Sequence, residues 1–130
     1  MFNLFRKTSS AASPAPKPDS EPGAIPEILS EADFDRLRDN PSAVLFKHSP
    51  SCPVSRAAMR EVRDFVAANP AVPVSLIHVV HSRALSQRVA GITKIRHESP
   101  QTIVFRNGEV IGDLSHEGVT AEELETVLAR

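Results

Sequence analysis

Residues 43–55 read AVLFKHSPSCPVS, and this stretch decides the fold. It opens on four apolar residues in a row, 43–46, as expected of a strand that is buried on both faces of a sheet. A Ser-Pro-Ser sequence then breaks the pattern, and Pro53 stands where proline favours the first position of a helix. The segment therefore predicts a buried strand, a tight turn and a helix that begins next to the chain's single cysteine, Cys52.

A long helix and a second buried strand are predicted directly after this turn. Apolar residues recur at helical spacing over residues 53–68, and Asn69-Pro70 ends that helix because the residue before a proline avoids the helical region. Residues 74–80 form the next apolar run. Residues 82–91 read as a short helix closed by Gly91 just past its end. Strands that alternate with helices favour parallel pairing through crossover connections.

The C-terminal part of the chain predicts a hairpin and a last helix. Strands are predicted at residues 102–105 and 109–114, on either side of Asn107-Gly108, which is the strongest short-range hairpin signal. Thr120, followed three residues later by a glutamate, is a capping box that begins an amphipathic helix. The acidic residues of that helix read as its solvated face: Glu122, Glu123 and Glu125.

The N-terminal segment has a different composition. Residues 8–22 are rich in Pro, Ser and Ala, and such a segment cannot bury enough apolar surface to offset the entropy of ordering it. We therefore divide the chain into a disordered Pro/Ser/Ala-rich tail, residues 1–23, and one folded domain, residues 24–130. The tail is either an extension without a role or a tether, with residues 1–5 as a small docking patch.

The folded domain opens with a short first strand, predicted from Ile25, Ile28 and Leu29. A helix follows that begins at Ser30 and ends at Asn40-Pro41. The complete order is strand, helix, strand, helix, strand, helix, strand, strand, helix. This is the order of a thioredoxin-like fold: an α/β architecture with a central mixed sheet flanked by helices.

Composition excludes several functional classes. The 130 residues carry 15 basic and 16 acidic side chains, a formal net charge of -1, and neither Trp nor Tyr, which argues against a nucleic-acid partner or a polybasic membrane surface. No stretch approaches the ~20 apolar residues that span a bilayer, and no signal peptide is evident. One cysteine excludes an internal disulfide and fits a reducing compartment. We expect a cytoplasmic monomer without membrane or nucleic-acid partners.

Cys52 is the candidate catalytic residue. Free backbone N–H groups and the positive end of the helix dipole point at its sulfur, and both stabilise the thiolate. Ser51, Pro53, Val54 and Ser55 complete the active-site turn. Ser55 occupies the position where a dithiol oxidoreductase carries its resolving cysteine, so a hydroxyl there can donate a hydrogen bond to the thiolate but cannot form a disulfide. The alternative is an inert, buried structural cysteine.

Two further pairs of residues are candidate supports for this site. Lys47 and His48 can add positive potential near the sulfur; the alternatives are a solvated charge at a strand end and a loop histidine bonded to backbone. Ser99-Pro100 precedes the strand at residues 102–105, where a thioredoxin arrangement places a cis-proline opposite the nucleophile. The Ser99 backbone would then pair with an extended substrate chain. The alternative is an ordinary trans proline that opens a strand.

Metal and nucleotide sites are not indicated. The histidines at 78, 81, 97 and 116, taken with Cys52, match no standard metal-site spacing. The chain has no glycine-rich phosphate-binding motif. We therefore expect no metal and no bound cofactor.

Three segments resemble the monothiol bacilliredoxin family (YtxJ-like). Residues 46–55, FKHSPSCPVS, match its FKHSxxCPxS signature, and residues 97–101 match its HESPQ segment. Ser115-His116, followed by Thr120, resembles its C-terminal SH and T residues. The resemblance runs from about residue 25 to residue 130.

This resemblance implies a thioredoxin fold and exchange of protein mixed disulfides with bacillithiol, a low-molecular-weight thiol that some bacteria use in place of glutathione. Cys52 would be the attacking thiol and Pro100 the cis-proline opposite it. Bacillithiol, or another low-molecular-weight thiol, would be a co-substrate, and the partners would be proteins that carry its mixed disulfides. Family members often have an aromatic residue after the SH pair, where this sequence has Glu117.

The leading hypothesis is therefore a monothiol thiol–disulfide oxidoreductase, a thioltransferase that removes bacillithiol from proteins. A second hypothesis is a binding or adaptor module with a thioredoxin fold and an incidental thiol. A third is an iron–sulfur carrier similar to monothiol glutaredoxins, with a cluster held between two chains by Cys52 and a soluble thiol.

Overall fold

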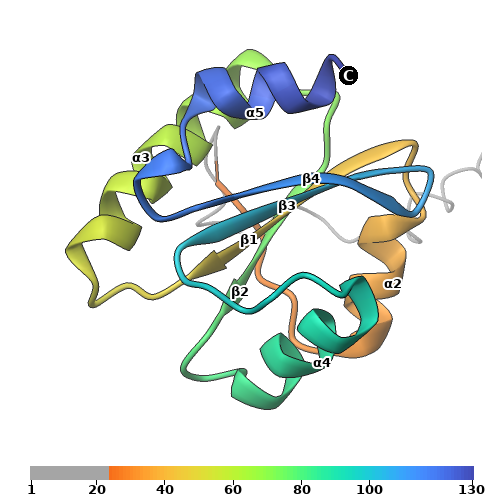
Figure 1. Ribbon diagram of the computed structural model, residues 1–130, viewed down its shortest axis with the longest axis vertical. Helices are drawn as coiled ribbons and strands as arrows, with labels where there is room; N and C mark the ends of the chain where they lie inside the picture. Colours follow the sequence, from red (N-terminus) through yellow and green to blue (C-terminus); the bar gives the residue numbers. More distant parts are fainter. Residues whose placement is uncertain (1–23) are drawn as a thin grey trace, which may run out of the picture.

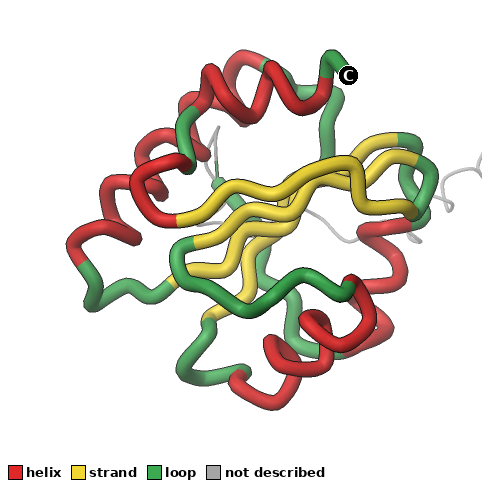
Figure 2. The backbone as a smooth tube through the Cα atoms, in the orientation of Figure 1, coloured by secondary structure: helices red, strands yellow, loops and turns green. Residues whose placement is uncertain are grey.

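The computed structural model describes residues 24–130, and the predicted tail, residues 1–23, lies outside the described residues. In chain order the described elements are α2 (Glu31–Arg38), β1 (Ser42–His48), α3 (Pro53–Ala68), β2 (Val74–His78), α4 (Arg83–Thr93), β3 (Gln101–Arg106), β4 (Glu109–Ser115), the 3-10 turn η2 (His116–Gly118) and α5 (Ala121–Leu128). Helices α3 and α5 cover one face of the sheet, and α2 and α4 cover the other (Figure 1). Figure 2 shows the resulting three layers.

The four strands form one mixed sheet in the order β2-β1-β3-β4. β1 pairs in parallel with β2 across the α3 crossover, and antiparallel with β3, which pairs antiparallel with β4 through the hairpin. Asn107 and Gly108 have φ angles of 53° and 82°, the left-handed conformation that a tight hairpin turn requires. The predicted thioredoxin-like α/β fold with a central mixed sheet is confirmed.

Strand β1 lies at the centre of the sheet and is covered on both faces. Its residues 43–48 are all buried, which explains the continuous apolar run in the sequence. Because side chains alternate along a strand, Val44 and Phe46 point to the α3/α5 face, whereas Leu45 points to the α2/α4 face. The same alternation sends Lys47 to the α4 side and His48 to the α3 side.

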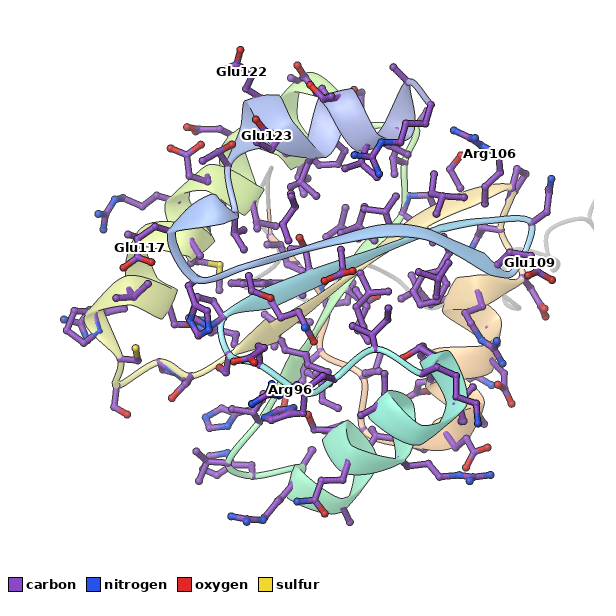
Figure 3. All side chains as sticks on the ribbon, viewed as in Figure 1. Arg96, Arg106, Glu109, Glu117, Glu122 and Glu123 are labelled. Atoms are coloured by element: carbon purple, nitrogen blue, oxygen red, sulfur yellow. The ribbon has the colours of Figure 1, made fainter. Side chains whose placement is uncertain are left out.

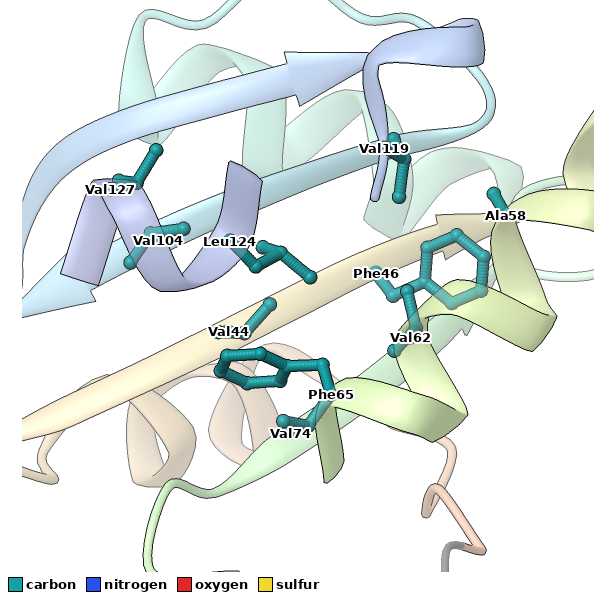
Figure 4. Close-up of a cluster of buried hydrophobic side chains, with 10 residues drawn as sticks. All are labelled: Val44, Phe46, Ala58, Val62, Phe65, Val74, Val104, Val119, Leu124 and Val127. Carbon is teal, nitrogen blue, oxygen red and sulfur yellow. The ribbon is translucent and has the colours of Figure 1, made fainter. Parts of the chain in front are cut away.

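Two hydrophobic clusters hold the layers together, one on each face of the sheet. Figure 4 shows the cluster between the sheet and helices α3 and α5, where Phe65 and Leu124 meet β1. Full burial of an aliphatic or aromatic side chain contributes about 1.5–3 kcal/mol. These clusters therefore fix α3, and with it the position of the cysteine at its first turn.

Helix starts follow their sequence signals. The Ser30 hydroxyl accepts a hydrogen bond of 3.1 Å from the Asp33 N–H at the start of α2. The Thr120 hydroxyl accepts one of 3.1 Å from the Glu123 N–H at the start of α5. Figure 3 shows Glu122 and Glu123 on the outer side of α5, as predicted for its acidic face. No helix among residues 24–130 has the length and apolar character needed to cross a membrane.

The predicted first strand is reduced to one parallel bridge, between Glu27 and Leu76. The Leu76 N–H donates to the Pro26 carbonyl, and the Ile28 N–H donates to the Leu76 carbonyl, both at 2.8 Å. Pairing stops there because Pro26 has no N–H to donate and Ser30 already caps α2. β2 likewise ends at His78 rather than at residue 80.

The predicted end of α4, at Gly91, is also wrong. Gly91 lies inside α4, which continues to Thr93, and the left-handed residue past its end is Lys94, with φ 63°. The additional residues let Ile92 pack against the α2/α4 cluster, and the Thr93 hydroxyl donates to the Val89 carbonyl at 2.8 Å. Tertiary packing, rather than the glycine, sets the end of this helix.

Two glycine variants test this description. A Cβ at Gly91 would meet no atom within 4 Å, so Gly91→Ala should raise the free energy of unfolding by about 0.5–1 kcal/mol, as alanine does inside a helix. A Cβ at Gly112, on β4, would lie 2.7 Å from Val127 Cγ1, so Gly112→Ala should lower it by about 1–3 kcal/mol through overpacking. Urea denaturation measures the free energy of unfolding of both variants. If Gly91→Ala were less stable than wild type, α4 would end at Gly91, as the sequence predicts, and the description above would be contradicted.

Candidate active site

Cys52 is the N-cap of α3, with an extended backbone, and Pro53 follows it at the first helical position, as predicted. The Cys52 N–H donates to the Ser49 carbonyl at 3.0 Å, and the Arg56 N–H donates to the Cys52 carbonyl at 2.9 Å. The thiol is partly exposed and makes no capping hydrogen bond. The backbone is therefore fixed on both sides of the residue, while its sulfur stays free to react.

The Ser55 hydroxyl forms hydrogen bonds within the active-site turn and not with the Cys52 thiol. Ser55 is buried, its Oγ accepts a hydrogen bond of 2.9 Å from the Ser49 N–H, and it lies 2.7 Å from His48 Nδ1. We assign the Nε2–H tautomer to His48, because the hydroxyl then accepts one hydrogen bond and donates the other. The expectation that this hydroxyl can donate to the Cys52 thiolate is thus corrected: its proton is engaged by His48.

His48 is the last residue of β1 and is buried against α3. Burial lowers its pKa, and the neighbouring His78 and Arg63 lower it further. The ring is therefore neutral at physiological pH, and it acts as a hydrogen-bond acceptor for Ser55 rather than as a source of positive potential. The alternative of a loop histidine bonded to backbone is also wrong, since the Nδ1 partner is a side chain.

Lys47 is fully buried on the opposite face of the sheet, so the expectation of a solvated strand-end charge is wrong. Its Nζ donates to His97 Nδ1 at 3.1 Å and to the Ser86 carbonyl at 3.4 Å. Burial lowers the pKa of Lys47 to about 8. Burial and the Lys47 charge lower the pKa of His97 as well, which keeps its Nδ1 available as an acceptor. Lys47 therefore ties β1 to the segment that precedes Pro100.

A second loop lies at the same end of the central strands as the active-site turn. β1 and β3 are antiparallel, with Lys47 opposite Gln101, so the loop that enters β3 arrives where β1 delivers the active-site turn. The Ser99–Pro100 peptide bond in this loop is cis, and Pro100 is buried. The Pro100 carbonyl accepts a hydrogen bond of 2.8 Å from the His116 N–H, which joins the loop to η2.

The segments that carried the family resemblance contact one another. Glu98 Oε1 lies 2.9 Å from His116 Nε2, and Gln101 Nε2 donates to the Ser115 hydroxyl at 3.3 Å. These bonds join the HESPQ segment to the SH pair. Sequence reasoning missed them because the partners are 14 to 18 residues apart and meet only through the β3–β4 pairing.

A hollow of about 440 Å³ opens between the start of α3 and η2. Pro53 and Val54 of the active-site turn line one side, and His116, Glu117 and Thr120 line the other. Figure 3 shows Glu117 on η2, beside α3. Glu117, the residue that departs from the family pattern, therefore lines the same hollow as Pro53 and Val54 of the active-site turn. Among residues 24–130, no group of three or more His, Cys, Asp or Glu side chains is placed to hold a metal ion.

A thioredoxin-like fold with a cysteine at the N-cap of the helix after its central strand defines the class of thioredoxin-like thiol–disulfide oxidoreductases. Residues 26–124 match the family described as monothiol bacilliredoxin BrxC. The chain belongs to this family, and its function is thiol redox chemistry.

Solved structures agree with this assignment of fold. A structure described as a candidate oxidoreductase with a thioredoxin fold has a TM-score of 0.77 and 27% identity, and the match covers 82% of this chain and 95% of the other. Mitochondrial thioredoxin 3 from Saccharomyces cerevisiae gives a TM-score of 0.64 at 18% identity, over 78% of this chain and 91% of the other. Thioredoxin from Trypanosoma brucei brucei gives 0.68 at 12% identity, over 85% and 93%.

Removing the Ser55 hydroxyl tests the role of this residue in the turn. Ser55→Ala leaves the Ser49 N–H and His48 Nδ1 without their partner in a buried site, so the free energy of unfolding should fall by about 1–3 kcal/mol. The matched control is Ser51→Ala on the exposed side of the same turn, which should change it by less than about 0.5 kcal/mol. Equal effects in urea denaturation would contradict a bracing role for Ser55.

The buried lysine makes stability depend on pH. Because the pKa of Lys47 falls from 10.5 to about 8 on folding, the unfolded chain binds more protons between these values, and stability rises with pH across that window. Below pH 8 the desolvated charge should lower the free energy of unfolding by at most about 3 kcal/mol, and by less where solvent screens it. We expect Lys47→Met to be about 1–3 kcal/mol more stable than wild type at pH 7, with the difference narrowing towards pH 10.5. Denaturant titrations at several pH values measure it; a pH-independent difference would contradict a charged, desolvated Lys47.

Proposed function

We propose that the protein is a monothiol thioltransferase that removes bacillithiol from protein mixed disulfides, with Cys52 as the nucleophile. One observation carries the proposal: the chain's single cysteine caps α3 with its sulfur unbonded, while the residue one helical turn later is a serine whose hydroxyl is engaged elsewhere. Such a thiol can accept a mixed disulfide, but the chain holds no second thiol to clear it.

The exchange proceeds in two balanced steps. The Cys52 thiolate attacks the bacillithiol sulfur of the mixed disulfide, a Cys52–bacillithiol disulfide forms, and the client's cysteine leaves as a thiolate that takes up a proton. A second bacillithiol, as thiolate, then attacks the bacillithiol sulfur of this adduct. Cys52 is released as thiolate, and bacillithiol disulfide leaves. The rate of each attack follows the thiolate fraction of the attacking thiol and the acidity of the leaving thiol.

The α3 N-terminus supports the anionic forms of Cys52 in both steps. The first N–H groups of a helix have no partner within the helix, and the positive end of its dipole favours a negative charge beside it. Ser51, Pro53 and Val54 shape the turn, whereas Ser55 and His48 hold it closed through their hydrogen bond. Lys47 acts at a distance in this proposal, by anchoring the loop that carries Ser99 and Pro100 through His97.

The client polypeptide would bind along the loop that enters β3. An extended client segment can add to free backbone groups as an extra strand, which positions its modified cysteine by main-chain hydrogen bonds. The Ser99 backbone, beside Pro100, is the proposed partner for that segment. The hollow between α3 and η2 is lined by His116, whose N–H donates to the Pro100 carbonyl, and it would take client side chains. Bacillithiol is then a co-substrate, and the reducing cytoplasm is the proposed compartment, with the protein acting as a monomer.

Intact-mass spectrometry tests this proposal. Reduced protein is mixed with a bacillithiolated peptide and, separately, with a glutathionylated copy of the same peptide. We expect a bacillithiol adduct on Cys52 and a free peptide thiol from the first mixture. Cys52→Ser should abolish transfer, and Ser55→Ala should retain measurable transfer, because its hydroxyl takes no part in the exchange.

The other outcomes separate the alternatives. Removal of bacillithiol by the Cys52→Ser protein would overturn the mechanism. Transfer from the glutathionylated peptide alone would keep the mechanism and overturn the bacillithiol assignment. No adduct from either peptide, with Cys52 still open to alkylation by iodoacetamide, would favour a binding module with an incidental thiol.

A further inference from the structure

A second hollow, of about 300 Å³, lies on the other flank of the active-site turn. Its lining is distinct from that of the hollow beside η2 except for Arg60, which borders both. We call it the arginine hollow. Its lining residues are His48, Pro50, Arg56, Met59, Arg60 and Arg63. Its volume matches the lower end of the range for small-molecule sites, about 300–1,000 Å³.

Three arginines line this hollow because their spacing on α3 puts them on one face of the helix. Arg56, Arg60 and Arg63 stand at positions i, i+4 and i+7, which lie above one another along the helix axis. All three are exposed at the surface. His48 lines the same hollow as Arg63, whose charge helps to lower the pKa of that ring.

These arginines have no carboxylate partner among residues 24–130. The arginine ion pairs of the described residues are formed by Arg36, Arg38, Arg88 and Arg96 instead. Glu61, on the same helix, is engaged in accepting a hydrogen bond of 2.9 Å from the Ala121 N–H. Helix α3 therefore carries three arginines against two carboxylates, Glu61 and Asp64, and among residues 24–130 neither carboxylate forms an ion pair with these arginines.

The hollow borders the active-site turn through Pro50, although Cys52 itself does not line it. Pro50 lies two residues before Cys52, and Arg56 lies one helical turn after it. The Arg56 guanidinium donates to the Pro50 carbonyl at 3.2 Å, which ties the rim of the hollow to the active-site turn. Buried His48 contributes an Nε2–H with no hydrogen-bond partner in the part of the chain that the structure describes, since Ser55 occupies its Nδ1.

We propose that the low-molecular-weight thiol is an acidic one and that the arginine hollow binds its carboxylates while its sulfur exchanges at Cys52. This inference rests on the proposed function and adds to it the residues that select the thiol. Guanidinium groups suit this role, because their planar N–H pairs match a carboxylate and remain charged at every physiological pH. Arg60 and Arg63 are the binding residues, and the His48 Nε2–H is an additional neutral donor.

Charge on the thiol is the variable that tests the subsite. One peptide is prepared as a mixed disulfide with bacillithiol and, separately, with bacillithiol whose carboxylates are methyl esters. Acidic side chains of the peptide contribute equally to both substrates, so they are excluded as the source of any difference. The test variant is the double change Arg60→Gln and Arg63→Gln. The control, Arg36→Gln on α2, removes a charge across the sheet.

We expect the double variant to lose about tenfold in kcat/KM for the bacillithiol adduct, which corresponds to about 1.4 kcal/mol of transition-state stabilisation. It should lose less than about twofold for the methyl ester, because the ester carries no negative charge for the arginines to bind. Arg36→Gln should change neither value. An equal loss on both substrates would overturn the proposal, because the arginines would then act on Cys52 or on the fold. No loss on either substrate would overturn it as well.

A binding measurement keeps the subsite testable if no transfer occurs at all. Cys52→Ser protein is titrated with S-methyl bacillithiol, which cannot exchange, and the arginine side-chain N–H signals are followed by NMR. We expect shifts at Arg60 and Arg63 with the acid and none with its methyl ester. Shifts without transfer in the wild type would refute the proposed function and retain the subsite. Transfer without shifts or charge preference would refute the subsite alone.

Discussion

The active-site turn depends on one buried hydroxyl. Ser55 Oγ joins the first turn of α3 to both the last residue of β1, through His48 Nδ1, and the first residue of the loop, through the Ser49 N–H. The loop between strand and helix is thereby closed on itself, and Cys52 stands at its apex with the sulfur unbonded. A cysteine in place of this serine would supply a resolving thiol; the serine supplies rigidity and leaves resolution to an external thiol.

The last two residues of β1, Lys47 and His48, anchor the two loops of the site through hydrogen bonds. His48 points to α3 and completes the hydrogen bonds of the turn, whereas Lys47 points to α4 and reaches His97, in the loop that ends at Pro100. The two loops that a substrate would meet are thus anchored on neighbouring residues of the most buried strand. The cost is a desolvated ammonium group, since no carboxylate among the described residues pairs with Lys47. The Lys47 charge lowers stability but holds the loop that ends at Pro100, so we infer that it is retained for function rather than for stability.

Local signals were sufficient for much of this architecture. The apolar run before Cys52, Pro53 after it and the Asn107-Gly108 turn each act within a few residues, and the structure follows them. Gly91 misled because the packing of Ile92 outweighs a helix-end preference. Lys47 and Ser55 could not be placed from sequence, because their partners are set by strand pairing and by closure of the turn. The spacing of the arginines on α3 is visible in the sequence. Only the structure shows that these arginines form no ion pair among residues 24–130.

The central claim is that Cys52 can accept a low-molecular-weight thiol but cannot release it unaided. The most direct measurement is the lifetime of the adduct in a single turnover: reduced protein, one equivalent of bacillithiolated peptide and no free thiol, followed by intact mass over time. The account predicts an adduct on Cys52 that persists until bacillithiol is added and then disappears. An adduct that clears without added thiol, or one that bacillithiol does not remove, would contradict it.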